Sequence, residues 1–222
     1  MTRTLRTLPA CAAFMLCPLM VASAWGADPA NITADEAMRW LKDGNQRFAE
    51  GKAIHGHQQA ERRAEVAKGQ QPFAIIVCCS DSRVGPEIVF DQGLGDIFVV
   101  RAAGNVVDDV GLGSIEYAVE HFGTPLVVVL GHNRCGAVSA AVSGGEAHGH
   151  VRAVVDAIRP AVEKVKGQPG DPVENAVRAN VREVVKRLQN AAPILPDRVK
   201  AGKLKIVGAG YNLDSGRVEW IK

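Results

Sequence analysis

Two short polar clusters contain the residue types that bind transition metals. Cys79 ends the apolar run 73–79, and the run 125–130 leads within two residues to His132-Asn133-Arg134-Cys135. Two thiolates and one imidazole suit a borderline-soft ion such as zinc. Three protein ligands would leave one position for water or substrate, as catalytic zinc requires. The alternative is that both cysteines are ordinary buried thiols and His132 is a turn residue.

A carboxylate and a guanidinium follow the first cysteine closely. Asp81 and Arg83 lie two residues apart, so they can form an ion pair beside the metal. Arg83 would hold Asp81 ionised and oriented, and Asp81 would accept a hydrogen bond from a metal-bound hydroxide. The alternative is an Asp that stabilises a turn, next to a surface Arg.

Both clusters must be positioned by the strands that precede them. Continuous apolar runs predict buried strands at 73–79, 97–100, 125–130 and 204–207, and 217–221 is expected to pair with the last of these. Helical patterns occupy 33–50, 59–68, 111–122, 135–143, 151–166 and a segment that begins at Asp171. This alternation predicts an α/β fold in which a mainly parallel β-sheet is flanked by helices. Ligands bind such sheets at the carboxyl ends of the strands, where both polar clusters fall.

Two other features of the sequence are not expected to form part of a functional site. Alternation along the strand points Cys78 away from Cys79, so Cys78 is expected in the core. Gly208-Ala209-Gly210 follows a strand, but position 213 is Leu and no helix follows. We therefore reject a dinucleotide site.

Composition excludes several classes of protein. The 222 residues are 47% hydrophobic and 23% charged, with a formal net charge of +2. These values exclude a disordered chain and give no sign of a nucleic-acid binder. The length suits one domain, and the apolar runs are too short for a membrane bundle.

The N-terminus has the features of a secretory signal peptide. Arg3 and Arg6 precede an apolar run from about residue 8 to 21, and Ala22-Ser23-Ala24 provides a cleavage site. The alternatives are an uncleaved membrane anchor and a cytosolic helix. Loss of residues 1–24 would remove two arginines and no acid, leaving 24 basic and 24 acidic residues and three cysteines. We expect an exported, most simply periplasmic, protein that does not touch the membrane after cleavage.

The motifs resemble those of the β-class carbonic anhydrases. Cys79-Ser80-Asp81-Ser82-Arg83 matches that family's C-x-D-x-R, and His132 to Gly136 matches its H-x-x-C-G. Arg101-Ala102-Ala103-Gly104-Asn105 resembles the family's R-x-x-x-N segment. The resemblance runs from about Thr33 to Trp220.

The resemblance implies a β-carbonic anhydrase fold and a reaction. Cys79, His132 and Cys135 would bind one zinc ion per subunit, with Asp81 and Arg83 as the catalytic pair. A zinc-bound hydroxide would hydrate CO₂ reversibly to bicarbonate and a proton.

The resemblance also implies a substrate pocket and a resting state. Gln70, Phe98, Tyr117 and Gly136 would bind the substrate. Ile76 stands where members with a regulatory bicarbonate pocket have Trp. We therefore expect water as the fourth ligand near neutral pH, rather than a closed form in which Asp81 binds zinc.

The domain and partner expectations follow from the same resemblance. Residues 25–222 would form a single domain, in which the arm 25–54 packs on a partner subunit of a homodimer or a tetramer built from dimers. CO₂ and bicarbonate would be the ligands, and no nucleic acid would bind. The alternatives are a related zinc hydrolase that acts on CS₂ or COS, and a non-catalytic zinc-binding module.

Overall fold

A five-stranded, mainly parallel sheet forms the centre of the chain. The computed structural model describes residues 32–221, so the expected signal peptide at 1–24 lies outside it. The strands are β1 (Ala74–Cys78), β2 (Ile97–Arg101), β3 (Leu126–His132), β4 (Lys205–Tyr211) and β5 (Val218–Ile221). They lie in the order β2-β1-β3-β4-β5. The first four are parallel, and β5 pairs antiparallel with β4, as the sequence predicted.

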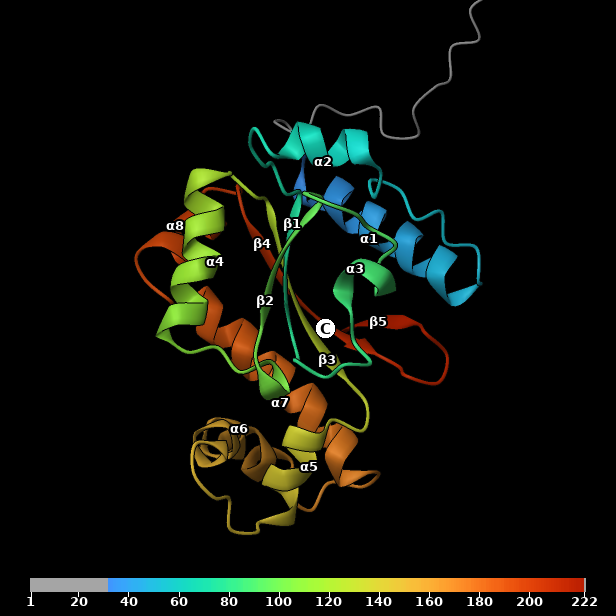
Figure 1. Cartoon of the computed structure of the whole chain (residues 1–222). Coiled ribbons are helices and arrows are strands. Elements are labelled where there is room, and N and C mark those ends of the chain that lie inside the picture. Colours follow the sequence, from blue (N-terminus) through green and yellow to red (C-terminus); the bar gives the residue numbers. More distant parts are fainter. Residues whose placement is uncertain (1–31, 222) are drawn as a thin grey trace, which may run out of the picture.

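Helices connect the strands and cover the sheet (Figure 1). They are α1 (Ala34–Ala49), α2 (Ala60–Val66), α3 (Pro86–Val89), α4 (Asp109–His121), α5 (Gly136–Ser143), α6 (Val151–Val165), α7 (Pro172–Gln189) and α8 (Ile194–Lys200). A 3₁₀ turn, η2 (Ala103–Asn105), follows β2. The sequence analysis did not predict α3, α8 or this turn. None of the helices within residues 32–221 combines the length and the apolar character that a membrane span needs.

Side chains on the two sheet faces alternate between two apolar cores. Ile76 and Cys78 of β1 pack in a core with residues of α1 and α3. Ile75 and Val77 pack in the other core, with residues of α4, α7 and α8. All five residues of β1 are buried, which explains why this strand is apolar throughout instead of alternating.

The first helix is fixed to its own subunit. Thr33 caps it in a capping box with Glu36, which the sequence predicted. Ala37 and Leu41 are fully buried against the sheet of the same chain. The Asn45 side chain donates to Val89 O at 3.0 Å and to Gly216 O at 2.8 Å. This face of α1 therefore belongs to the fold of one subunit.

A smaller layer lies beyond the carboxyl ends of the strands. Helices α5 and α6 lie there, below the sheet in Figure 1, and pack on the N-terminal part of α7. Their apolar cluster includes Cys79 and Cys135. The polar clusters identified in the sequence thus lie between the sheet and this layer.

Candidate metal centre

Three buried side chains converge at the carboxyl ends of β1 and β3. Cys78 is the last residue of β1 and pairs with Leu130 of β3, so Cys79 follows beside the end of β3, where His132 is the last residue. The sulfur atoms of Cys79 and Cys135 and a ring nitrogen of His132 all lie within 4.8 Å of one another. The residues are 5%, 1% and 1% exposed, respectively. The three predicted metal ligands therefore form one group.

The imidazole of His132 is oriented for ligation. Its Nδ1 lies 2.9 Å from the carbonyl oxygen of Asn133. A carbonyl can only accept, so Nδ1 carries the proton and Nε2 keeps a free lone pair. This Nε2 atom is buried and has no hydrogen-bond partner among residues 32–221. A buried hydrogen-bond acceptor without a partner lowers the stability of the fold unless a metal ion or another group binds it.

The spacing of the donor atoms fits zinc. The two sulfur atoms lie 4.0 Å apart, far longer than the bond of about 2.05 Å in a disulfide. Tetrahedral zinc with Zn–S bonds of about 2.3 Å places its two sulfurs about 3.8 Å apart. The donor set and the orphaned nitrogen of His132 therefore fit a zinc ion without rearrangement of the fold.

Hydrogen bonds stabilise negative charge on the cysteines. The hydrogen bond from the Cys135 thiol lowers the pKa of Cys79 to about 4, and the amides of Asp81 and Gly104 add to this effect. The neighbouring Cys79 sulfur raises the pKa of Cys135. Cys135 is the N-cap of α5, whose first amides lower that pKa in part. A divalent metal binds cysteines as thiolates, so its binding would displace the proton from Cys135.

Asp81 lies beside this group in the predicted ion pair. Its two carboxylate oxygens accept from Nε and Nη2 of Arg83 at 2.9 and 2.7 Å. Its Oδ2 lies 3.8 Å from His132 Nε2. The Arg83 hydrogen bonds hold the pKa of Asp81 well below its usual range. The carboxylate is therefore an ionised, oriented acceptor at the edge of the centre.

Arg101 holds the loop between Cys79 and Val84. Its guanidinium donates to the carbonyl oxygens of Cys79, Asp81 and Val84 at 3.0, 2.8 and 2.8 Å. The motif that contains Arg101 did not predict this role. The signal was its position at the carboxyl end of the strand adjacent to β1.

Three of the predicted substrate residues lie elsewhere in the subunit. Gln70 and Tyr117 line a pocket of about 520 Å³, together with Phe122. The ring of Phe98 lies 6.3 Å from that of Phe122. Phe98 pairs with Ile75, four residues before Cys79, which places it about 13 Å along the strand from the sulfur ligands. One subunit therefore does not bring these three residues to the metal centre.

The remaining predicted residues lie where the sequence placed them. Gly136 is the first residue of α5, directly after the ligand Cys135. Cys78 is fully buried in the core, and burial raises the pKa of its thiol to about 12. Its expected core position is confirmed.

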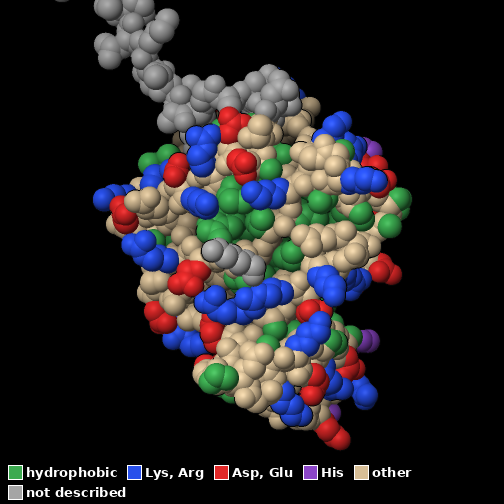
Figure 2. All heavy atoms as spheres, turned by 180° about the vertical axis from the view of Figure 1, so that it is seen from behind, with side chains coloured by type: hydrophobic (Ala, Val, Ile, Leu, Met, Phe, Trp, Pro, Cys, Tyr) green, Lys and Arg blue, Asp and Glu red, His purple; other side chains and the backbone are tan. Residues whose placement is uncertain are grey.

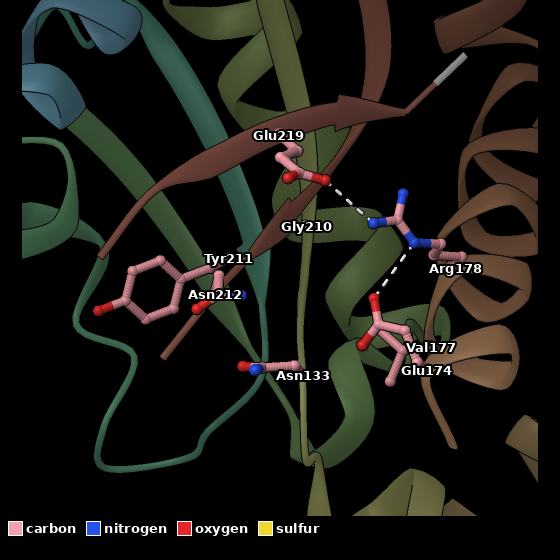
Figure 3. A pocket seen from close by; sticks show the side chains of 8 residues that line it. All are labelled: Asn133, Glu174, Val177, Arg178, Gly210, Tyr211, Asn212 and Glu219. Atoms are coloured by element: carbon pink, nitrogen blue, oxygen red, sulfur yellow. Dashed lines mark hydrogen bonds and ion pairs between the residues drawn. The ribbon is translucent and has the colours of Figure 1, made fainter. Parts of the chain in front are cut away.

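A second polar pocket lies on the α7 side of the sheet (Figure 3). It has a volume of about 110 Å³ and is lined by residues of β4, β5 and α7, together with Asn133 and Asn212, which directly follow β3 and β4. Arg178 lies between Glu174 and Glu219 and forms an ion pair with each. Its charged groups are therefore all engaged in ion pairs with one another, and none of them belongs to the metal-binding group.

Comparisons with known proteins agree with this geometry. A family model described as "Carbonic anhydrase" matches residues 74–218. A protein of Mycobacterium tuberculosis named carbonic anhydrase 2 is 46% identical over 191 residues, which are 84% of this chain and 92% of that protein. Solved structures are similar too. The β-carbonic anhydrase CcaA has a TM-score of 0.67 at 28% identity, covering 83% of this chain and 95% of that one. A tetrameric β-carbonic anhydrase of Sordaria macrospora has a TM-score of 0.68 at 26% identity, with coverages of 83% and 96%.

Proposed function

This chain belongs to the β-carbonic anhydrase family, and we propose that Cys79, His132 and Cys135 form the zinc centre at which it hydrates CO₂ reversibly to bicarbonate. The observation that carries the assignment is the convergence of three buried donors beside an ionised carboxylate, Asp81. A zinc ion bound there supplies Lewis acidity, which lowers the pKa of water. Three protein donors leave room for a reactant, whereas structural zinc has four.

The side chains around the centre bind and orient the reactants and the metal ligands. Asp81 Oδ2 accepts a hydrogen bond from the attacking water and directs its lone pair toward CO₂. Arg83 fixes the rotamer of Asp81 through two charge-assisted bonds. The hydrogen bond from Nδ1 to Asn133 O holds the ring of His132 in place during turnover. Gly136 adds no side chain at the start of α5, which leaves space for substrate next to Cys135.

We propose that Gln70, Phe98 and Tyr117 complete the site of a second subunit. They form a half-exposed, largely apolar group about one strand length from the metal centre of their own chain. Tyr117 is 49% exposed and Leu94 in the same pocket 45%, which is unusual for large apolar side chains unless a partner covers them. Hydrophobic side chains also gather in the middle of the face seen in Figure 2, between Lys and Arg side chains. A homodimer, alone or paired into a tetramer, would cover such surfaces, and the Sordaria relative is tetrameric.

A complementation experiment tests this arrangement. Asp81→Ala removes the carboxylate of one half-site, and Gln70→Ala removes the amide of the other. If each site uses both subunits, random mixing of the two impaired variants raises the activity to about a quarter of the wild-type value, because half of the dimers contain one intact site. Mixed subunits that show no more activity than the separate variants would contradict shared sites.

We also propose that the protein is exported and loses residues 1–24. The proposal depends on the arginines, the apolar run and the A-x-A sequence described above. Secretion of the full chain from a bacterial host should give a mature N-terminus at Trp25. A purified protein that begins at Met1 would contradict it.

One measurement tests the assigned reaction directly. The chain lacking residues 1–24 should contain one zinc per subunit and should hydrate CO₂ above pH 8. A zinc-loaded protein without hydration at that pH would contradict the assignment.

A further inference from the structure

A glycine amide contributes to the surroundings of the zinc ligand Cys79. The amide of Gly104 donates to Cys79 Sγ at 3.2 Å, and the amide of Asp81 donates to the same sulfur at 3.4 Å. Gly104 lies in the turn η2 and has φ 65° and ψ 23°. Its N–H therefore points at the metal centre from a left-handed conformation that favours glycine.

A buried side chain of α7 forms a hydrogen bond with the backbone of this glycine. Asn180 Nδ2 donates to the carbonyl oxygen of Gly104 at 2.8 Å, across 76 residues of sequence. Asn180 is 3% exposed and lies in the middle of α7. On the buried face of α7, its neighbours one turn before and after are the apolar residues Val177 and Val184. A buried amide lowers the stability of a fold unless it makes hydrogen bonds. Packing alone therefore does not explain an asparagine at this position, whereas its hydrogen bond to Gly104 does.

Neighbouring helices close the remaining space around Gly104. A Cβ atom at this position would lie 2.5 Å from Ile158 Cδ1 of α6 and 3.2 Å from Ala137 Cβ of α5. The turn is therefore in contact with α5, α6 and α7 at once. Of these contacts, the Asn180 hydrogen bond is the one that sets the direction of a polar group on the glycine.

We propose that Asn180 is a positioning residue for the zinc ligand Cys79 and acts through the backbone of Gly104. The bond holds the peptide plane that follows Gly104, and because no side chain restricts rotation at this glycine, this anchor limits the backbone movement that would turn its amide away from the sulfur. An N–H···S bond withdraws charge from the thiolate and orients its lone pairs toward the metal. The inference rests on the zinc site of the proposed function.

Two variants of Asn180 remove the donor while they preserve the bulk of the side chain. Asn180→Leu is apolar and excludes water from the gap. Asn180→Asp keeps the shape but places an acceptor against the carbonyl. Val184→Ala is the matched control, because Val184 lies one turn further on α7, is buried and lines the same pocket of about 190 Å³ as Asn180. Val184 packs in a different apolar cluster from the two ligand cysteines.

The first measurements are zinc affinity and the spectrum of the cobalt-substituted protein. Competition with a chromophoric chelator should show affinity lowered about 10- to 100-fold in both Asn180 variants, the range for loss of a group that orients a ligand. The thiolate-to-cobalt charge-transfer band should move to longer wavelength, because a sulfur without its hydrogen bond is easier to oxidise. Val184→Ala should lower the melting temperature but change neither readout.

A direct observation keeps the inference testable if neither Asn180 variant folds. In cadmium-113-substituted wild-type protein, NMR should show coupling between the metal and the Gly104 amide proton across the N–H···S bond. Absence of that coupling overturns the inference. So does a folded Asn180 variant with affinity within twofold of wild type and an unmoved band, or the same loss in Val184→Ala. A wild-type chain that binds no metal would instead overturn the proposed function itself.

Discussion

Replacement of Asp81 by alanine is expected to slow CO₂ hydration and leave the zinc in place. Asp81 is not one of the three buried donors, so the metal-binding group remains complete without it. Its Oδ2 nevertheless lies 3.8 Å from His132 Nε2, at the edge of that group. Arg83 holds both carboxylate oxygens in one orientation. The variant therefore removes an oriented acceptor and leaves all three metal donors in place, while it also releases Arg83 from its hydrogen bonds to the carboxylate.

The size of the effect follows from the hydrogen bond that is lost. A hydrogen bond to a charged group contributes about 1.5–3 kcal/mol, and each 1.36 kcal/mol changes a rate about tenfold. The rate should therefore fall about 10- to 150-fold. The pKa of Asp81 is lowered, so its contribution is present above that low value and is lost only as the pH falls through it. The ratio of wild-type to variant rates should hence be constant from about pH 6 to pH 9.

Stopped-flow hydration with a pH indicator, together with zinc analysis of the same samples, measures both quantities. Asp214→Ala is the control, because it removes a carboxylate whose side chain is 65% exposed and is paired with Arg134, a residue between His132 and Cys135. It should change neither the zinc content nor the rate by more than about twofold. A rate for Asp81→Ala within threefold of wild type would refute the reasoning. Loss of zinc in parallel with the rate would refute it equally, because Asp81 would then support the metal.

Three further predictions concern the fold and the ligands. Cys79→Ser should lose its zinc, whereas Cys78→Ala should keep one zinc per subunit and only lower the melting temperature, as metal analysis and thermal unfolding can show. Asp91 is buried, which raises its pKa, but its arginine partner on α1 and two backbone amides together lower it below the usual value. The ionised carboxylate thus stabilises the fold above about pH 4, and this stabilisation is lost on acidification. The unfolding free energy of Asp91→Asn should therefore be about 3 kcal/mol lower than that of the wild type at pH 7. Between pH 5 and pH 3 the variant should lose much less of its stability than the wild type does. Gly208→Ala should lower the unfolding free energy by about 1–3 kcal/mol, because its Cβ would lie 2.7 Å from Val181 of α7; an unchanged denaturation midpoint would contradict this packing.

The group of three donor residues could be predicted from the sequence because each belongs to a local pattern. Cys79 directly follows β1 and His132 ends β3, and parallel strands bring their carboxyl ends to one edge. The Asp81–Arg83 pair spans two residues, so sequence distance alone allows it. Continuous apolar runs also predicted the four parallel strands, since buried parallel strands are apolar throughout, and β5 was predicted as the partner of β4.

The contacts that support the ligands could not be predicted in the same way. Arg101 and Asn180 reach the site from residues 20 and 76 positions away in the sequence, through bonds to backbone carbonyls that no side-chain pattern records. The short helix α3 and the turn η2 carry too few residues for a periodic signal. The position of Phe98 relative to the metal depends on strand register, which became measurable only in three dimensions.

Metal binding and the alignment of Asp81 depend on different kinds of contact in this chain. The ligands are buried and are held by backbone amides and by Asn133 O, groups that move only if the fold moves. Asp81 is oriented by Arg83, whose side chain is 52% exposed and free to exchange with water. Because salt screens exposed charges far more than buried ones, high ionic strength should weaken the orientation of Asp81 before it affects metal retention. Activity and zinc content should therefore separate as salt rises, with activity declining first.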